Sequence, residues 1–258
     1  MANSLTNLAN LYDAQGAHAR AEPLHRRAIE ILEAALGKNH PRVAEALANL
    51  ANVYQDQGDY QRAELFMQRA LEIEETALGS KHPLVASSLN HLAGLYVSQG
   101  DFARAALLLQ RALEIWEAAL GKHHPSVALA LRNLAAIDTE QGAYARAESL
   151  LERARHIEEA ALGPDHPDIA PTLNNFAVLY RTLGDYPRAE PLYERALRLR
   201  EVALGPEHPD VAFSLQYLAL IHLAENRLAA SLPLFERALA INEARLRRDP
   251  TLTRAGLL

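Results

Sequence analysis

The residues of this sequence that could do chemistry recur at one fixed interval. The dipeptide His-Pro begins at His40, His82, His124, His166 and His208, and each step is 42 residues (82 − 40 = 42). Histidine is a common metal ligand, but zinc ligands must lie within about 2.3 Å of one ion. Packed helices are about 8–10 Å apart, so one histidine per interval cannot converge on an ion. We therefore predict that each histidine orders the start of a helix before its proline, and that the chain binds no metal.

A glutamate and an arginine follow the same interval. The series are Glu33, Glu75, Glu117, Glu159, Glu201 and Glu243, and Arg27, Arg69, Arg111, Arg153, Arg195 and Arg237. Carboxylates act as general acids or bases only when they converge in a water-poor site. A residue present in every interval is better explained by a structural role at each junction, where we expect the glutamate to accept hydrogen bonds near the next turn. A second set, such as Arg62 with Glu64, is interpreted as a solvated outer helix face.

The remaining sequence signals exclude several classes of function. The sequence has no phosphate-binding loop, nucleophile elbow or metalloprotease motif, so it predicts neither an enzyme nor a cofactor. The 258 residues carry a net charge of −6, which argues against binding to nucleic acid or anionic lipid. The absence of cysteine excludes disulfides and is compatible with a cytoplasmic setting. We find no long apolar run, so no membrane span is predicted.

Each interval contains two helices. Pro41 suits the first turn of a helix, where its missing N–H is not needed. Apolar residues then follow at spacings of three and four over residues 43–54, which indicates an amphipathic helix. Gly58 can end it in a left-handed conformation, and Asp59 can cap a second helix that stops at Gly79. The short break between the two helices makes them antiparallel.

The repetition itself defines the fold. Neither helix can bury its apolar face alone, so each hairpin must stack on the next. Small residues recur where helices approach closely: Ala9, Ala51, Ala93, Ala135, Ala177 and Ala219 in the first helix. The sequence predicts an all-α solenoid, a single domain over residues 1–258 with repeats of about 1–40, 41–82, 83–124, 125–166, 167–208 and 209–258.

These residues carry a resemblance to a known family. The pattern Leu-x-x-Leu-Ala-x-x-Tyr, seen at residues 47–54, is followed by Gly-x-Tyr and two alanines. It resembles the tetratricopeptide repeat, whose usual unit is about 34 residues. Eight further residues, such as "LGSKHPLV" at 78–85, lengthen the second helix and its turn, as in kinesin-light-chain-like repeats. The resemblance implies a right-handed superhelix of six helix-turn-helix units, with the first helix of each lining the concave side.

Amide side chains mark where a ligand is expected. One position of the first helix reads Asn7, Asn49, His91, Asn133, Asn175 and Tyr217, and the preceding position reads Thr6, Ala48, Asn90, Arg132, Asn174 and Gln216. Asparagine is a mediocre helix former, but its amide offers a donor and an acceptor that match a peptide backbone. With Asn52 and Arg181 one turn later, the candidate peptide-binding residues are Asn7, Asn49, Asn52, Asn90, His91, Arg132, Asn133, Asn174, Asn175, Arg181, Gln216 and Tyr217.

The resemblance supports that interpretation in part. In kinesin-light-chain-like arrays, asparagine in this part of the first helix contacts bound peptide, and Asn49, Asn133 and Asn175 match that placement. His91 and Tyr217 depart from it, so binding along all six repeats is not uniform. The alternative is that these asparagines bond only to neighbouring repeats or to water. Arg132 and Arg181 would favour an acidic peptide.

Three functional hypotheses follow. The first is a non-catalytic interaction scaffold that binds a peptide or protein segment in its concave groove. The second is a sensor or regulatory arm of a larger multidomain enzyme, because the first repeat lacks its lead-in and the last repeat decays, with Asn226 in place of glycine. Such a last repeat is either a cap or the edge of an excised segment. The third is a solenoid that assembles end to end. The regular register would suit a designed array, whereas the irregular groove residues favour a natural one.

Overall fold

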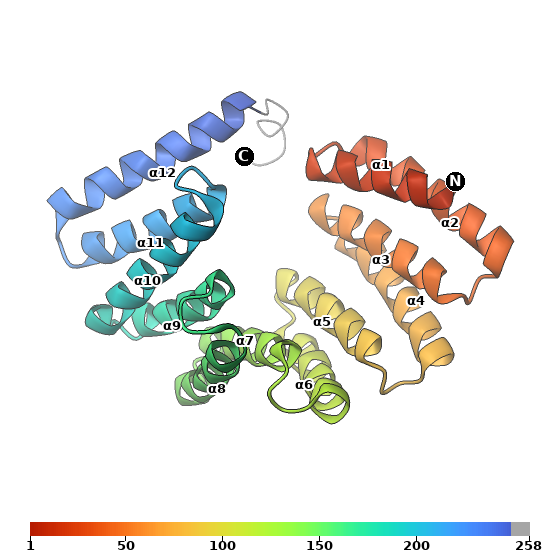
Figure 1. Cartoon of the computed structure of the whole chain (residues 1–258), viewed down its shortest axis with the longest axis horizontal. Helices are drawn as coiled ribbons and strands as arrows, with labels where there is room; N and C mark the ends of the chain where they lie inside the picture. Colours follow the sequence, from red (N-terminus) through yellow and green to blue (C-terminus); the bar gives the residue numbers. More distant parts are fainter. Residues whose placement is uncertain (249–258) are drawn as a thin grey trace. The chain divides into compact units, whose positions relative to one another are not determined.

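A computed structural model describes residues 1–248 of the chain. This part contains twelve α-helices, one 3-10 turn and no strand (Figure 1), so the prediction of an all-α repeat fold is confirmed. The helices divide into two compact units, residues 1–122 and the described residues from 123 onward. The expectation of a single domain over 1–258 stays a prediction, and residues 249–258 of its last repeat lie outside the described residues.

Three helical hairpins make up the first unit. Its helices are α1 (Ala2–Ala14), α2 (His18–Leu36), α3 (Pro41–Asp56), α4 (Tyr60–Leu78), α5 (Pro83–Ser98) and α6 (Phe102–Leu120). Each helix packs on the next, and the first helices α1 and α3 also touch. This is the arrangement that stacked 42-residue repeats require, because each hairpin covers the apolar face of its neighbour.

The second unit repeats this plan with one irregularity. Its elements are α7 (Pro125–Glu140), α8 (Tyr144–Leu162), η1 (Pro167–Ile169), α9 (Ala170–Thr182), α10 (Tyr186–Leu204), α11 (Pro209–Ala224) and α12 (Leu228–Arg248). In the repeat that begins at His166, the first turn is the 3-10 helix η1, in which the Ala170 N–H donates to the Pro167 carbonyl. Pro171 follows and has no N–H to offer that carbonyl an α-helical bond, which explains why α9 begins at Ala170.

The five histidines of the His-Pro series cap helices, as predicted. Each Nδ1 accepts a hydrogen bond at 3.2 Å from the backbone N–H two residues later; the residues are His40, His82, His124, His166 and His208. The proline that follows takes the first position of the helix. Asp59 also caps its helix as predicted, with Oδ1 accepting from the Arg62 N–H at 3.1 Å. The interval therefore repeats a start signal for five of the six helix pairs, and α1 lacks it.

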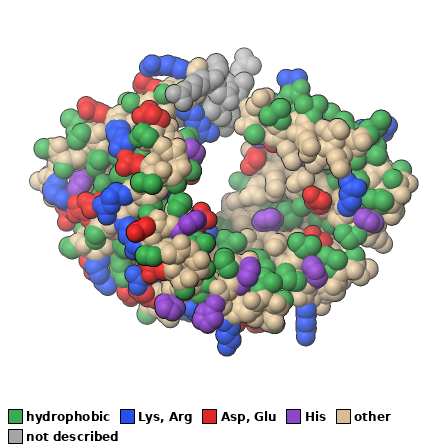
Figure 2. Space-filling view, in the orientation of Figure 1, with side chains coloured by type: hydrophobic (Ala, Val, Ile, Leu, Met, Phe, Trp, Pro, Cys, Tyr) green, Lys and Arg blue, Asp and Glu red, His purple; other side chains and the backbone are tan. Residues whose placement is uncertain are grey.

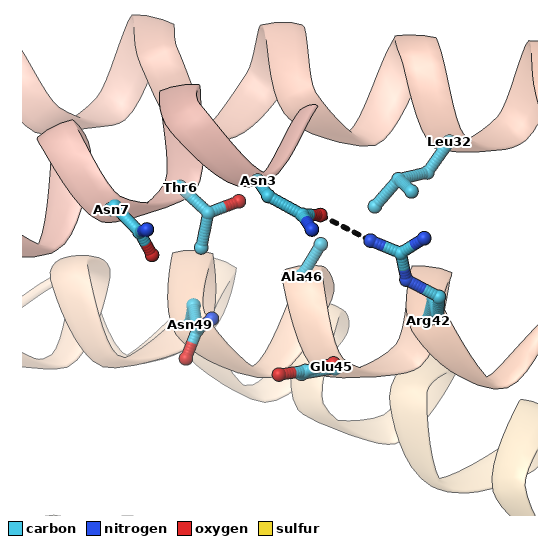
Figure 3. Close-up of a pocket in the computed structure, with 8 residues that line it drawn as sticks. All are labelled: Asn3, Thr6, Asn7, Leu32, Arg42, Glu45, Ala46 and Asn49. Atoms are coloured by element: carbon cyan, nitrogen blue, oxygen red, sulfur yellow. Dashed lines mark hydrogen bonds between the residues drawn. The ribbon is translucent and has the colours of Figure 1, made fainter. Parts of the chain in front are cut away.

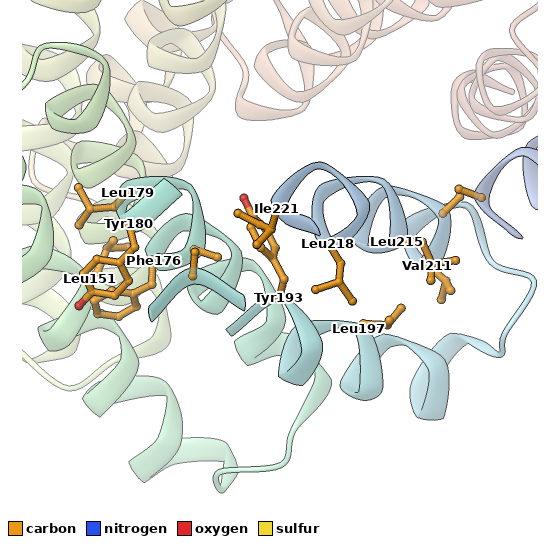
Figure 4. Packing of buried hydrophobic residues seen from close by; sticks show 14 of the residues in the cluster. Leu151, Phe176, Leu179, Tyr180, Tyr193, Leu197, Val211, Leu215, Leu218 and Ile221 are labelled. Atoms are coloured by element: carbon orange, nitrogen blue, oxygen red, sulfur yellow. The ribbon is translucent and has the colours of Figure 1, made fainter. Parts of the chain in front are cut away.

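The alanines predicted at close helix approaches are buried. Ala9, Ala93, Ala135, Ala177 and Ala219 have 0% of their surface exposed, and Ala51 has 1%. Larger side chains fill the space beside them, and Figure 4 shows those of the second unit, where Leu151, Tyr193 and Leu215 are fully buried. Interiors packed this closely leave no room for bulkier residues at the alanine positions.

The recurring arginines and glutamates join successive repeats. Within the first unit Arg69 pairs with Glu33, and Arg111 with Glu75. Within the second, Arg237 pairs with Glu201 at 2.6 Å. In a further pair, Arg195 lies 3.2 Å from Glu159 and also donates to the Pro164 carbonyl in the preceding turn at 2.5 Å. The predicted structural role is confirmed, and the partner of the glutamate is the arginine of the next repeat.

A second junction contact is made by the residues interpreted as a solvated outer helix face, whose arginines are exposed. The hydroxyls of Tyr54, Tyr96 and Tyr180 each donate at 2.7 Å to a glutamate of the preceding repeat, Glu22, Glu64 and Glu148 respectively. Arg62, Arg104 and Arg188 cover the three rings, with the guanidinium carbon 4.1–4.5 Å from the ring centroid. These charged residues therefore hold repeats together, because cations are attracted to the faces of aromatic rings. We call this contact the tyrosine clasp.

The outer surface carries charges of both signs. Figure 2 shows acidic and basic side chains interspersed on the face in view, which accords with a net charge of only −6. Among residues 1–248, none of the helices combines the length and the apolarity needed to cross a bilayer.

Candidate functional site

A polar pocket lies between α1 and α3 in the first unit. It has a volume of about 420 Å³ and is lined by Asn3, Thr6, Asn7, Leu32, Arg42, Glu45, Ala46 and Asn49 (Figure 3). Leu32 and Ala46 are buried and contribute apolar surface, whereas the other six side chains are polar. Two of the predicted groove residues, Asn7 and Asn49, are thus brought to one site.

Several polar side chains of this pocket have no hydrogen-bond partner among the described residues. The Arg42 guanidinium donates to the Asn3 amide oxygen. Within the described residues, Asn7, Asn49 and Glu45 have no hydrogen-bond or ion-pair partner. The site therefore presents amide donors and acceptors beside one cation and one anion, without any arrangement of a nucleophile and a base.

The other candidates of the first unit lie on α3 and α5. Asn52 is exposed one turn after Asn49, and Asn90 is partly buried. His91 is exposed, yet the surrounding protein displaces enough water to lower the pKa of its imidazole. Loss of water disfavours the charged imidazole, and the neutral ring offers one donor and one acceptor, as an asparagine does.

In the second unit, Arg132 and Asn175 make structural contacts. Arg132 on α7 donates to Glu158 on α8 at 3.2 Å. Both are largely withdrawn from water, and this burial lowers the pKa of Arg132 and raises that of Glu158. Asn175 Nδ2 donates to the Arg132 carbonyl at 3.3 Å. The alternative interpretation, in which an asparagine bonds to the neighbouring repeat, therefore describes Asn175, and Arg132 is not a free cation for an acidic ligand. Asn133 lies beside them, partly buried on α7.

Asn174 also has an internal partner. In the amide orientation that matches donors with acceptors, its oxygen accepts from both terminal nitrogens of Arg200 at 2.8 Å. Arg200 donates further to Ser214 Oγ at 2.5 Å, and burial lowers the pKa of its guanidinium. Arg200 was not predicted, because it belongs to a second helix, α10, and the candidate residues were sought only on first helices.

The candidate residues on α11 lie among aromatic side chains. Tyr217 stacks on the fully buried Tyr193, with ring centroids 5.5 Å apart, and touches Phe213, which is 58% exposed. Burial raises the pKa of Tyr193 to about 12. Gln216, next to Tyr217 in the chain, is partly buried, as is Arg181 on α9, whose Nε has no hydrogen-bond partner among the described residues. This part of the candidate site differs in chemistry from the pocket of the first unit.

Six of the eight pocket residues are not among the candidate residues: Asn3, Thr6, Leu32, Arg42, Glu45 and Ala46. Asn3 and Glu45 occupy one position of the 42-residue interval, four residues before Asn7 and Asn49 respectively. Residues four apart share a helix face, so the spacing contained the signal that places them in the pocket. Arg42 lies at the start of α3 and had no comparable signal.

Comparison with known families identifies the class of protein. A model of the tetratricopeptide repeat matches residues 1–75, 66–118, 84–157, 126–201 and 168–244. The chain therefore belongs to the tetratricopeptide repeat family. No curated protein sequence matches it.

Solved structures place the chain near kinesin-light-chain-like members of that family. BtubC (BKLC) from P. vanneervenii is 25% identical, with a TM-score of 0.68 and coverage of 90% of each chain. A putative kinesin light chain from Podosopora anserina, described as having nearly identical TPR-like repeats, is 27% identical, with a TM-score of 0.62 over 81% of this chain and 99% of that one. The apo form of RapI, 17% identical, shares the fold with a TM-score of 0.71 over 94% of this chain and 83% of that one. The predicted resemblance is confirmed.

Proposed function

We propose that this chain is a non-catalytic scaffold that binds an extended segment of a partner protein along its first helices. Tetratricopeptide repeats generally bind peptides or proteins, and members of the family are typically non-catalytic. The observation that carries the proposal is the pocket between α1 and α3, where the amides of Asn7 and Asn49 have no partner within the described residues. The proposal keeps the cytoplasmic setting expected from the sequence.

The chemistry of this pocket suits a peptide backbone. Asn7 and Asn49 are equivalent residues of successive repeats, so their amides are presented in the same way by α1 and α3. Each can donate to a carbonyl and accept from an N–H of an extended chain. The buried Leu32 and Ala46 provide apolar surface for a side chain of the bound segment. Because side-chain amides would bind the peptide backbone, segments of many sequences could be held, and the other lining residues would select among them.

The second unit would contribute a different kind of contact. Since Asn174 and Asn175 are held by internal hydrogen bonds, we assign its contribution to the half-exposed aromatic surface of Phe213 and Tyr217. Aromatic side chains give large contact area at low entropic cost. Self-assembly and a role as the arm of a larger enzyme stay predictions.

A double substitution in the pocket tests the proposal. A partner is first captured from extracts of the source organism, and its binding segment is mapped. Asn7→Ala with Asn49→Ala should weaken binding of that segment by about 1–3 kcal/mol, because each lost hydrogen bond contributes about 0.5–1.5 kcal/mol. Calorimetry measures the affinity, and circular dichroism checks that helicity is unchanged.

The matched control is Gln61→Ala, which removes an exposed amide from α4 outside the pocket. Its affinity should equal that of the parent chain. If the double variant binds as tightly as this control, the pocket is not the binding site.

A further inference from the structure

The turn between α11 and α12 differs in sequence from the equivalent turns of the other repeats at two positions, 222 and 225. His222 stands where the equivalent residues are Tyr12, Tyr54, Tyr96, Asp138 and Tyr180. Glu225 stands where they are Gln15, Gln57, Gln99, Gln141 and Leu183. This turn is therefore the only one of the six that combines an imidazole and a carboxylate at these two positions.

These substitutions bring three potential ligand atoms together. Glu190 on α10, His222 on α11 and Glu225 each offer one atom, and the three atoms lie within 4.8 Å of one another. His222 Nδ1 is 3.6 Å from Glu190 Oε1, beyond hydrogen-bond distance. The His222 side chain is 8% exposed, and its Nδ1 is buried without a hydrogen-bond partner. A buried polar atom with no partner costs free energy, so this nitrogen requires an explanation.

Arg227 now supplies positive charge to the two carboxylates. Its terminal nitrogens lie 3.0 and 2.6 Å from the two Glu190 oxygens, and it also contacts Glu225. Arg227 donates to both carboxylates, whereas His222 Nδ1 has no hydrogen-bond partner among the described residues. Its side chain is 40% exposed and has room to turn outward.

We propose that Glu190, His222 and Glu225 form a binding site for a divalent transition-metal ion such as Zn²⁺, which displaces Arg227 from the two carboxylates. One imidazole and two carboxylates are a donor set that zinc and its neighbours accept. Mg²⁺ and Ca²⁺ prefer oxygen donors and make no use of the histidine. The ion would join α10 to the turn after α11, where a tyrosine clasp joins repeats elsewhere. His222 does not belong to the His-Pro series, for which the sequence predicts no metal.

The experiment is a calorimetric titration of the untagged full-length chain, freed of metal by a chelator, with ZnCl₂. We expect one saturable site and a higher melting temperature with Zn²⁺. His222→Tyr and Glu225→Gln install the residues of other repeats, so both variants should fold. Each should bind Zn²⁺ more than about 100-fold more weakly, since loss of groups that only orient ligands already costs about 10–100-fold. Arg227→Ala removes the competing cation and should bind more tightly than the parent.

Two controls make the result decisive. His91→Asn installs the asparagine of other repeats at a distant histidine, and should bind Zn²⁺ like the parent chain. Titration with MgCl₂ should give no comparable affinity. The proposal is overturned if the parent chain shows neither binding heat nor a melting shift with Zn²⁺, or if His222→Tyr binds as tightly as the parent. In those cases the Glu190–Arg227–Glu225 ion pairs serve only to join the last two repeats. The test is independent of partner binding in the groove.

Discussion

At the scale of single residues, the tyrosine clasp explains how charged side chains stabilise this fold. Tyr180 donates to Glu148 at 2.7 Å, and Arg188 lies over its ring. Burial, reinforced by the bond to Glu148, raises the pKa of Tyr180 to about 12. Since the ordinary tyrosine pKa is about 10, folding favours the neutral phenol. The stabilisation is complete below pH 10 and is lost as the pH rises from 10 towards 12.

We therefore predict that Tyr180→Phe lowers the free energy of unfolding by about 0.5–1.5 kcal/mol at neutral pH, the usual net value of a hydrogen bond. The variant should also lose less stability than the parent chain between pH 10 and pH 12, because it lacks the ionising group. Urea unfolding followed by circular dichroism at several pH values measures both effects. Equal losses of stability in the two proteins over that range would show that Tyr180 is not buried against Glu148.

At the same scale, the sequence could predict only part of the candidate site. The interval of 42 residues placed Asn7 and Asn49 on equivalent faces of first helices, and the pocket contains both. It did not show that Arg132 pairs with Glu158 or that Asn175 reaches a main-chain carbonyl. Those contacts depend on which side chains span the gap between packed helices, and spacing along the chain does not determine that.

At the scale of the helices, two different glycine conformations end them. Gly58 has φ 75°, in the left-handed region, and the equivalent residue of the last repeat, Asn226, has φ 60°. Gly79 has φ 87° and ψ 147°, a combination that is essentially restricted to glycine. An added Cβ would meet no atom within 4 Å at either glycine, so any penalty arises from the backbone alone. The sequence predicted where both helices end. It did not predict this difference, because glycine can adopt either conformation.

The two positions should respond differently to the same substitution. Gly58→Asn should cost less than about 1 kcal/mol of unfolding free energy, since asparagine tolerates the left-handed region. Gly79→Asn should cost about 1–3 kcal/mol through backbone strain. Chemical denaturation of the pair gives the comparison, and each variant is the control for the other. A larger loss at Gly58 than at Gly79 would contradict this account of the two turns.

At the scale of the whole molecule, the same junction contacts recur within each unit. Removal of residues 41–82 takes out one complete interval, so Glu33 would meet Arg111 instead of Arg69, and Glu22 would meet Tyr96 instead of Tyr54. We predict that this shortened chain folds with unchanged helicity per residue. Its urea m-value should fall by about one sixth, in proportion to the surface lost on shortening. Circular dichroism and urea titration provide the measurement.

Removal of residues 41–61 is the control, because it deletes α3 with the first two residues of α4 and leaves two second helices in succession. That chain should lose cooperative unfolding, since apolar faces would no longer be covered. If both deletions unfold alike, the fold does not depend on the register of the interval.

The array could be predicted from the sequence because identical contacts must recur at identical spacing. The aromatic surface at Tyr217 could not, because it breaks the pattern.

The clasp and the arginine–glutamate pairs have a consequence for how such a chain changes over generations. Within each unit they join hairpins without using Asn7, Glu45 or Asn49, which line the pocket and take part in none of these contacts. Mutations at these lining positions therefore carry little penalty in folding, and selection can alter what the surface recognises while the framework stays constant. Descendants of one ancestral array can in this way acquire unrelated partners through a handful of substitutions.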